Sequence, residues 1–135
     1  MAVGLIHRDI TSNEFFDGTA KRHLLIRECD DCGHACVPAA QSCSACASPT
    51  LSWVEASGDG ILESWIVVHE RARDKGAEPT RTPVGLVELT EGPWIEAQLV
   101  DVDPDSLFHG QRFTVDFEAA EGGEALPVFR PAQQQ

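Results

Sequence analysis

The chain has 135 residues, of which 42% are hydrophobic, and a formal net charge of −12 at pH 7. This length fits one domain or two very small ones. Residues 1–46 hold six acids against four bases, and residues 47–135 hold sixteen against six. The chain therefore lacks the excess of Lys and Arg that a nucleic-acid-binding face needs, and we expect no nucleic acid among its partners.

The beginning of the chain, M-A-V-G-L-I-H-R-D-I, carries an early charge and no long apolar core, so it does not read as a signal peptide. No apolar run reaches the roughly 18 residues that a membrane helix needs. We therefore expect a cytoplasmic protein with no membrane partner.

A helix is predicted over residues 11–23, within an N-terminal helical segment spanning 1–24. Thr11 followed by Glu14 forms a capping box, in which the two side chains satisfy free amides at the helix start. Phe15 and Phe16 fall near helical spacing. They are predicted either to pack against the rest of the fold or to form a partner surface.

The next segment, predicted as a ribbon over residues 25–50, contains two C-x-x-C pairs. A short strand, Leu24 to Glu28, leads into the first pair. Each pair can occupy a tight turn, here called a knuckle, and two facing knuckles make the closed tetrahedral cage of a structural zinc site. Gly33, directly after the first pair, is predicted to take the positive φ that such a turn needs, and small residues also fill the second turn. The predicted metal ligands are Cys29, Cys32, Cys43 and Cys46.

Other interpretations of the four cysteines remain. Four thiolates bind iron as well as zinc, and the sequence does not separate the two. Two disulfides are disfavoured because a reducing compartment is expected. A redox C-x-x-C motif does not normally come as a facing pair. The fifth thiol, Cys36, is predicted to be a small buried residue; a reactive role would lack an activating partner beyond His34.

From residue 51 onward the pattern is entirely β, and the predicted fold is mainly β. Gly58 and Gly60 predict a bend, and residues 112–117 alternate strictly between apolar and polar. Short strands with glycine at the bends favour a five-stranded closed barrel of the OB type over residues 51–131, with an open sandwich as the alternative. A first strand is expected at 51–55. The five barrel strands are expected at 61–69, 85–89, 93–100, 112–117 and 126–130, followed by a tail at 132–135.

Two connecting segments between the predicted strands carry several charged residues. The segment from Glu70 to Pro83 is long and polar, and is predicted to be either a solvated loop or a basic arm that touches a phosphate or an acidic partner. Its bases are Arg71, Arg73, Lys75 and Arg81. The D-V-D-P-D run at 101–105 lacks the glycine and distal glutamate of a calcium loop and is predicted to be a turn.

No catalytic set emerges from the chain. The motifs of serine hydrolases, zinc proteases and phosphate-binding loops are missing from the sequence, and so is tyrosine. His69, next to Glu70, is the best candidate base, although a polar histidine at a strand end is the commoner situation. We therefore expect no catalytic residue in this chain acting alone.

The order of motifs is similar to that of one known family. A helix precedes a C-x-x-C-G…C-x-x-C ribbon, then S-G-D-G-I-L-E-S-W-I-V-V-H at 57–69 and P-V-G-L-V-E-L-T-E-G-P-W-I-E-A at 83–97. This arrangement resembles the zinc-ribbon plus OB-fold family associated with acyl-CoA metabolism, over about residues 12–131. The chain differs at Val84, where the family often has tyrosine, and at Ser44, where it often has proline.

The resemblance implies a rubredoxin-like zinc ribbon joined to an OB-fold barrel, with Zn²⁺ as the bound ion. It further implies an accessory, acyl-CoA-binding subunit of a thiolase-like or retro-aldolase complex, as in steroid side-chain degradation, in which the partner performs the chemistry. Phe15, Phe16, Arg71, Arg73, Lys75 and Arg81 would then contact the ligand or the partner. The alternatives are a stand-alone acyl-CoA carrier and an OB-fold protein that binds single-stranded nucleic acid.

Overall fold

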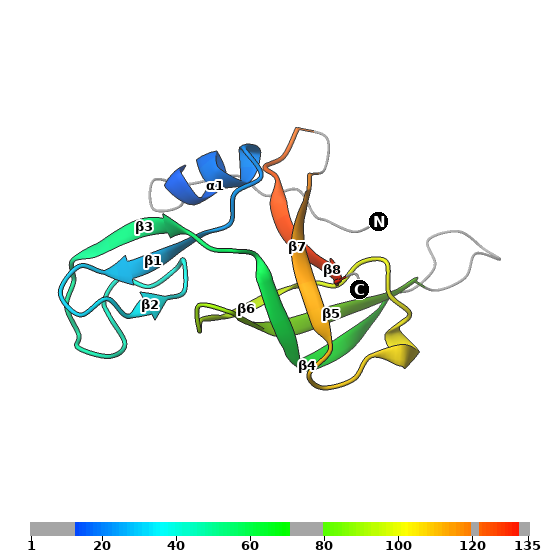
Figure 1. The fold of residues 1–135 in the computed structure, drawn as a ribbon. Coiled ribbons are helices and arrows are strands. Elements are labelled where there is room, and N and C mark those ends of the chain that lie inside the picture. The colour runs from blue at the N-terminus through cyan, green and yellow to red at the C-terminus, as the bar shows by residue number, and fades with distance from the viewer. Residues whose placement is uncertain (1–12, 71–79, 120–121, 133–135) are drawn as a thin grey trace.

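The computed structural model of the protein describes residues 13–70, 80–119 and 122–132. The fold is mainly β, with one short helix ahead of two sheets (Figure 1). No helix in these ranges is both long and apolar enough to cross a membrane. The elements are α1 (Asn13–Ala20), β1 (Leu25–Cys29), β2 (Ala35–Cys36), β3 (Leu51–Glu55), β4 (Asp59–Glu70), β5 (Thr80–Leu89), β6 (Trp94–Gln98), the 3-10 turn η2 (Pro104–Ser106), β7 (Arg112–Glu118) and β8 (Leu126–Pro131).

The helix α1 is shorter than predicted at its C-terminal end. It ends at Ala20 instead of residue 23, because Arg22 takes a left-handed conformation with a φ of 63°. The N–H of His23 then donates to the carbonyl of Gly18 at 2.8 Å, which is the outer bond of a Schellman cap. The predicted N-cap, Thr11, lies outside the described residues.

The first sheet has three strands in the order β2-β1-β3 and carries the cysteines. Its central strand β1 pairs antiparallel with both neighbours, so that Arg27 lies opposite Cys36 on one side and Trp53 on the other. The strand predicted to start at residue 51 is confirmed as β3, but it pairs with β1 and not with the second sheet. The strand β3 thus belongs to the sheet that carries the cysteines. The domain boundary at residue 51 stays a prediction.

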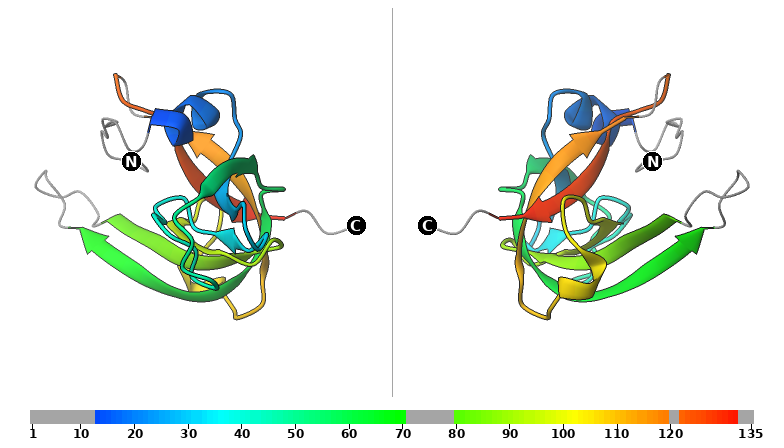
Figure 2. Two further views of the ribbon diagram at one scale, coloured as in Figure 1. Left: turned by 90° about the vertical axis from the view of Figure 1, so that its left-hand side faces the viewer. Right: turned by 90° about the vertical axis from the view of Figure 1, so that its right-hand side faces the viewer.

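The second sheet has five strands in the order β6-β5-β4-β7-β8 and curls on itself (Figure 2). A parallel bridge joins Leu99, just after β6, to Phe129 in β8, and the N–H of Val100 donates to the carbonyl of Phe129 at 2.8 Å. This contact brings the two edges of the sheet together. The curled half-barrel is consistent with an OB fold, as predicted, and not with an open sandwich.

The β4–β5 hairpin is longer than predicted. The connection expected from Glu70 to Pro83 is shorter, because β5 already begins at Thr80 and places Arg81 inside a strand. Pro83 has no N–H to donate, but it still contributes to the sheet as an acceptor. Its carbonyl accepts a hydrogen bond from the N–H of Leu99 at 2.9 Å. Arg81, one of the four bases of the predicted loop or arm, therefore lies in a strand.

Two predicted bends are confirmed. Gly58 has a φ of 88°, a left-handed conformation that glycine adopts without strain, and it turns the chain from the first sheet into the second. The acidic run at 101–105 forms the start of η2, where the carboxylate of Asp103 accepts the N–H of Asp105 at 2.9 Å. The run is thus a capped turn, as its composition indicated.

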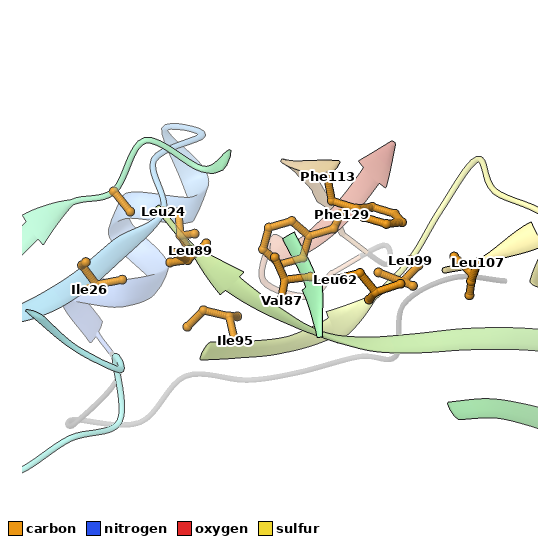
Figure 3. Packing of buried hydrophobic residues seen from close by; sticks show 11 residues of the cluster. Leu24, Ile26, Leu62, Val87, Leu89, Ile95, Leu99, Leu107, Phe113 and Phe129 are labelled. Atoms are coloured by element: carbon orange, nitrogen blue, oxygen red, sulfur yellow. The ribbon is translucent and has the colours of Figure 1, made fainter. Parts of the chain in front are cut away.

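One hydrophobic core connects the two sheets (Figure 3). Ile26 of β1 is 1% exposed, and Leu24, the residue before that strand, is 2% exposed. Both belong to the same cluster as the barrel residues. The ribbon and the barrel are therefore packed as one body along this line. The remaining members are Ala56, Leu62, Val87, Leu89, Ile95, Leu99, Leu107, Phe113 and Phe129.

Candidate metal centre

The first knuckle forms where β1 ends. Cys29 is the last residue of β1, and its carbonyl accepts the N–H of Gly33 at 2.9 Å, which closes the turn around Cys32. Gly33 has a φ of 77°, as the sequence predicted for this position. The N–H of Cys32 also points at the sulfur of Cys29, 3.4 Å away. The turn thus directs both sulfurs to one side.

The second knuckle repeats this geometry without a glycine. The carbonyl of Cys43 accepts the N–H of Ala47 at 2.8 Å, and the N–H of Ala45 points at the sulfur of Cys43 from 3.3 Å. Ala47 adopts a φ of 66°, which is uncommon for a residue with a side chain. An unfavourable backbone conformation held at this position indicates that the turn around Cys46 is imposed by its surroundings.

The two knuckles bring four sulfurs together. The Sγ atoms of Cys29, Cys32, Cys43 and Cys46 all lie within 4.8 Å of one another. The Cys29–Cys46 and Cys32–Cys43 sulfur pairs are each 3.6 Å apart. A disulfide would need about 2.05 Å, and all five cysteines are free thiols. A tetrahedral ion about 2.3 Å from each sulfur would separate the sulfurs by roughly 3.8 Å, so the spacing fits a four-thiolate metal site.

The electrostatics of the four thiols also favour a cation. Burial opposes ionisation of Cys43, but the N–H groups of Cys46 and Ala45 and the nearby thiols lower its pKa to about 6. The N–H of His34 favours the Cys32 thiolate, yet the neighbouring sulfurs raise the pKa of Cys32 to about 12. The crowded sulfurs therefore cannot all ionise by themselves, and a divalent cation is what would allow four thiolates to coexist.

The fifth thiol lies beside the centre without joining it. Cys36, in β2, is 4% exposed and packs against Cys29 and Cys43. Its sulfur lies 3.7 Å from the carbonyl oxygen of His34. The prediction that Cys36 is a small buried residue is confirmed. Cys29 and Cys43 are buried whereas Cys32 and Cys46 are exposed, so the four-sulfur cluster has one covered and one open side.

The predicted contact residues do not gather into one site. Phe16 is 7% exposed, while Phe15 is half-buried and its ring centroid lies 6.5 Å from that of Trp53. Arg81 lies in β5 and donates to Asp105 at 2.7 Å. Arg71, Arg73 and Lys75 lie outside the described residues. A role of these six residues in binding a ligand or a partner stays a prediction.

An apolar groove runs where the ribbon meets the barrel, and residue patterns alone did not reveal its lining. Its volume is about 610 Å³. Val37 and Trp94 border it and are 38% and 47% exposed, which is unusual for large apolar side chains that line a common hollow. The other lining residues are Phe15, Pro38, Ala39, Ile95, Glu96, Ala97, Gln98, Leu126, Pro127 and Val128.

No further cluster in the described part of the chain resembles a catalytic centre. His109 lies 3.0 Å from a carboxylate oxygen of Glu63, and this contact, followed by one with Glu88, lowers the pKa of Glu63. The side chain of His109 is 70% exposed, which is typical of a surface ion pair. Within the same residues the four cysteines are the one group of three or more possible metal ligands that lie close together.

Comparison with known proteins gives one consistent group of relatives. Residues 53–118 match the family model of the ChsH2 C-terminal OB-fold domain. The chain is 37% identical over 131 residues to a probable enoyl-CoA hydratase alpha subunit of Thermomonospora curvata, covering 96% of this chain and 40% of that protein. It is 34% identical to a DUF35 domain-containing scaffold protein of Pyrococcus furiosus, covering 67% of this chain and 65% of the relative.

A third relative and two solved structures complete the comparison. A DUF35 domain-containing scaffold protein of Methanothermobacter thermautotrophicus is 31% identical over 99 residues, covering 72% of this chain and 74% of the relative. The solved Ltp2-ChsH2(DUF35) aldolase has a chain that superposes with a TM-score of 0.78 at 34% identity, covering 97% of this chain and all of that one. A DUF35 protein of Sulfolobus solfataricus, at 16% identity and a TM-score of 0.62, shares the fold.

Proposed function

The chain belongs to the DUF35 family, and on this premise we propose that it is a non-catalytic accessory subunit of an enzyme complex acting on acyl-CoA thioesters. The partner would be a thiolase-like or aldolase subunit that makes or breaks a carbon–carbon bond. The chain spans 40% and 65% of the first two relatives, so their activities do not transfer to it as a whole.

One observation carries the proposal. The chain covers the full length of the superposed chain in a solved complex that is named an aldolase and joins Ltp2 to ChsH2. The name of the Thermomonospora curvata relative, which refers to enoyl-CoA, supports CoA thioesters as the substrate class.

The metal centre would serve structure in this role. Four thiolates fill the coordination sphere of a tetrahedral ion and leave no position for a substrate. We assign the ion as Zn²⁺, held by Cys29, Cys32, Cys43 and Cys46. Zinc would supply folding free energy to a ribbon that is too small to form a core of its own. Elemental analysis of the purified protein separates zinc from iron. A visible absorption spectrum checks the result, because a four-thiolate Fe³⁺ site is coloured and a Zn²⁺ site is not.

The apolar groove is the best place for this chain to touch a substrate. Its walls are mostly apolar, so they suit an aliphatic or alicyclic acyl group and not the phosphates of CoA. The net charge of −12 further disfavours binding of the CoA phosphates to this chain. We therefore place the acyl part along the groove and the nucleotide part on the partner, which would let this subunit shape the acyl channel.

Co-expression with the thiolase-like protein encoded nearest to this chain tests the proposal. We expect the two to elute together in size-exclusion chromatography and the pair to turn over an acyl-CoA faster than the partner alone. Separate elution, or thioester turnover by this chain alone, would contradict it. A thiolase from an unrelated pathway serves as the control for non-specific association.

Calorimetry separates this role from that of a stand-alone acyl-CoA carrier. The isolated chain should bind acyl-CoA weakly or not at all, and the complex should bind it tightly. Trp94→Ala, in the groove, should weaken the binding of acyl-CoA by the complex, whereas Phe108→Ala should leave that binding unchanged. Phe108 is a matched control because it is an aromatic residue of similar exposure, 56%, outside the groove. Tight binding by the isolated chain would favour the carrier.

A further inference from the structure

One edge of β4 is open over half of the strand. β4 pairs with β5 from Gly60 to Glu70 but with β7 only at residues 59–61. Leu62 still exchanges hydrogen bonds on that side, donating to the carbonyl of Gln111 and accepting from the N–H of Gly110, at 2.9 and 2.8 Å. Beyond it, no described residue offers a backbone hydrogen bond to this edge. Figure 1 shows the β4–β5 hairpin continuing past the rest of the sheet.

The outer face of this hairpin is apolar. Ile66 and Val68, two residues apart and therefore on one face of β4, are 64% and 38% exposed. Opposite Ile66 lies Val84 of β5, and opposite Ser64 lies Leu86, both half-buried. Two neighbouring strands thus present a continuous apolar stripe directly beside the open edge. We call the backbone edge from Ser64 to His69, together with Ile66 and Val68, the β4 edge.

Among the residues that the structure describes, nothing gives the β4 edge the usual protection. Proteins normally shield open strands with lysine, proline, a bulge or a covering loop, because a bare edge pairs with other chains. The segment 64–69 reads S-W-I-V-V-H, with no lysine, acid or proline and with residues that favour strands. The bulge of β4 falls between Leu62 and Ser64, before the edge begins. Such an edge in a stable protein is expected to be covered in the working assembly.

We propose that the β4 edge binds the partner enzyme subunit by strand addition, so that an extended segment of the partner becomes the next strand of the sheet. The inference rests on the proposed accessory function. The row of backbone donors and acceptors selects a strand over a helix, because only a strand can satisfy them in line. Ile66 and Val68 then select apolar side chains at alternate positions of that strand.

Charge argues against a second copy of this chain as the occupant. Each chain carries a net charge of −12, so two copies repel on approach. The same field would attract a strand whose flanks are basic. We therefore expect the partner segment to combine alternating apolar residues with lysine or arginine at its ends.

Three variants test the side-chain part of the inference. Ile66→Lys and Val68→Lys each place a charge in the centre of the stripe, and we expect either to weaken partner binding at least about tenfold, as a change at a central interface residue does. Phe108→Lys is the matched control, because Phe108 is 56% exposed but lies outside the strand, and it should change binding less than about twofold. Circular dichroism confirms that each variant is folded.

Hydrogen exchange tests the backbone part. In the complex, amides in the 64–69 segment that face away from β5 should exchange at least about tenfold more slowly, whereas in the free chain they should exchange quickly. Affinity lost in Ile66→Lys without any new amide protection would overturn strand addition. Equal affinity in all three variants would overturn the β4 edge as the interface.

Two further outcomes separate this inference from the proposed function. If wild-type protein does not bind the partner at all, the accessory function itself fails. If the chain alone forms a dimer in light scattering, and Ile66→Lys abolishes that dimer, the edge belongs to a second copy and the assignment to the partner subunit is overturned.

Discussion

The guanidinium of Arg22 donates a hydrogen bond to the carboxylate of Asp116, although the two residues are 94 positions apart. Arg22 is the left-handed residue that ends the helix, and Asp116 lies in the middle of β7. Arg130 of β8 donates to the other oxygen of the same carboxylate, and also to Asp101. A single carboxylate, 20% exposed, therefore joins the helical segment to two strands of the barrel.

Asp116→Asn should destabilise the protein in a pH-dependent way. The N–H of Phe117 and then Arg130 and Arg22 lower the pKa of Asp116, against an opposing effect of desolvation. A carboxyl group whose pKa is lower in the folded state contributes stability above its unfolded pKa and loses it as the pH falls through its folded pKa. We expect the variant to lose about 1.5–3 kcal/mol at pH 7, the scale of a hydrogen bond to a charged group.

Urea denaturation from pH 7 down to about pH 2 measures this effect. The difference between wild type and Asp116→Asn should persist to about pH 4 and then shrink, since both proteins are then neutral at this position. Asp105→Asn is the control, because the pKa of Asp105 is also lowered, by Arg81, but the pair is exposed and should add little stability. A constant difference across the whole pH range would mean that the charge of Asp116 is irrelevant.

Cys46→Ser should remove the metal, while Cys36→Ser should not. Both thiols lie in the same small sheet region, but the sulfur of Cys46 belongs to the four-sulfur group and that of Cys36 points to the carbonyl of His34. Binding and folding of such a centre are one equilibrium. We expect about one ion per chain in wild type and Cys36→Ser and almost none in Cys46→Ser, measured by elemental analysis. Equal loss in both variants would implicate Cys36 in the centre.

The sequence predicted the clustering of the four cysteines and the strand pattern well, for identifiable reasons. The spacing of Cys29, Cys32, Cys43 and Cys46 is a local signal, because each knuckle is formed by adjacent residues. The strict alternation of residues 112–117 likewise predicts β7 without knowledge of its neighbours. Features that depend only on neighbouring residues can therefore be predicted from the sequence.

The features that the sequence missed depend on contacts between distant segments. The end of the helix at Ala20 requires Arg22 in a left-handed conformation, which is rare for arginine and coincides with its ion pair to Asp116. The pairing of β3 with β1 follows from neither strand alone. The apolar groove and the β4 edge appear only once exposure is known, because isoleucine, valine and tryptophan in a strand normally predict a core.

Gly58→Ala should destabilise the protein more than Gly110→Ala. The two glycines have nearly equal φ values, 88° and 86°, so the cost of a side chain in the left-handed region is the same for both, about 1 kcal/mol. A Cβ at Gly58 would lie 2.4 Å from Cγ1 of Val115, whereas one at Gly110 would meet nothing within 4 Å. Overpacking adds about 1–3 kcal/mol at Gly58 alone.

Urea midpoints of the two glycine variants isolate this packing term, since the conformational term cancels in their difference. Circular dichroism of both variants in buffer confirms that they start from a folded state. Equal midpoints would mean that Val115 moves aside freely and that the bend between the two sheets is loosely packed.

Removal of the metal should loosen part of the barrel as well as the ribbon. β1 carries Cys29 at its end, and Ile26, 1% exposed, and Leu24 lie in the same core cluster as Leu89 and Ile95. When a chelator releases the ion, β1 loses the knuckle that fixes its end, and its apolar side chains lose their fixed position in that cluster.

Hydrogen exchange with and without a chelator measures how far this loosening spreads. Amides of β1 and β3 should lose most of their protection, those around Leu89 and Ile95 should lose part of it, and those around Phe113 should change least. The gradient is expected because Leu24 and Ile26 come from the ribbon side of the shared core, whereas Phe113 comes from β7. Unchanged exchange at Leu89 and Ile95 would mean that ribbon and barrel unfold independently despite their common core, and the metal would then stabilise the ribbon alone.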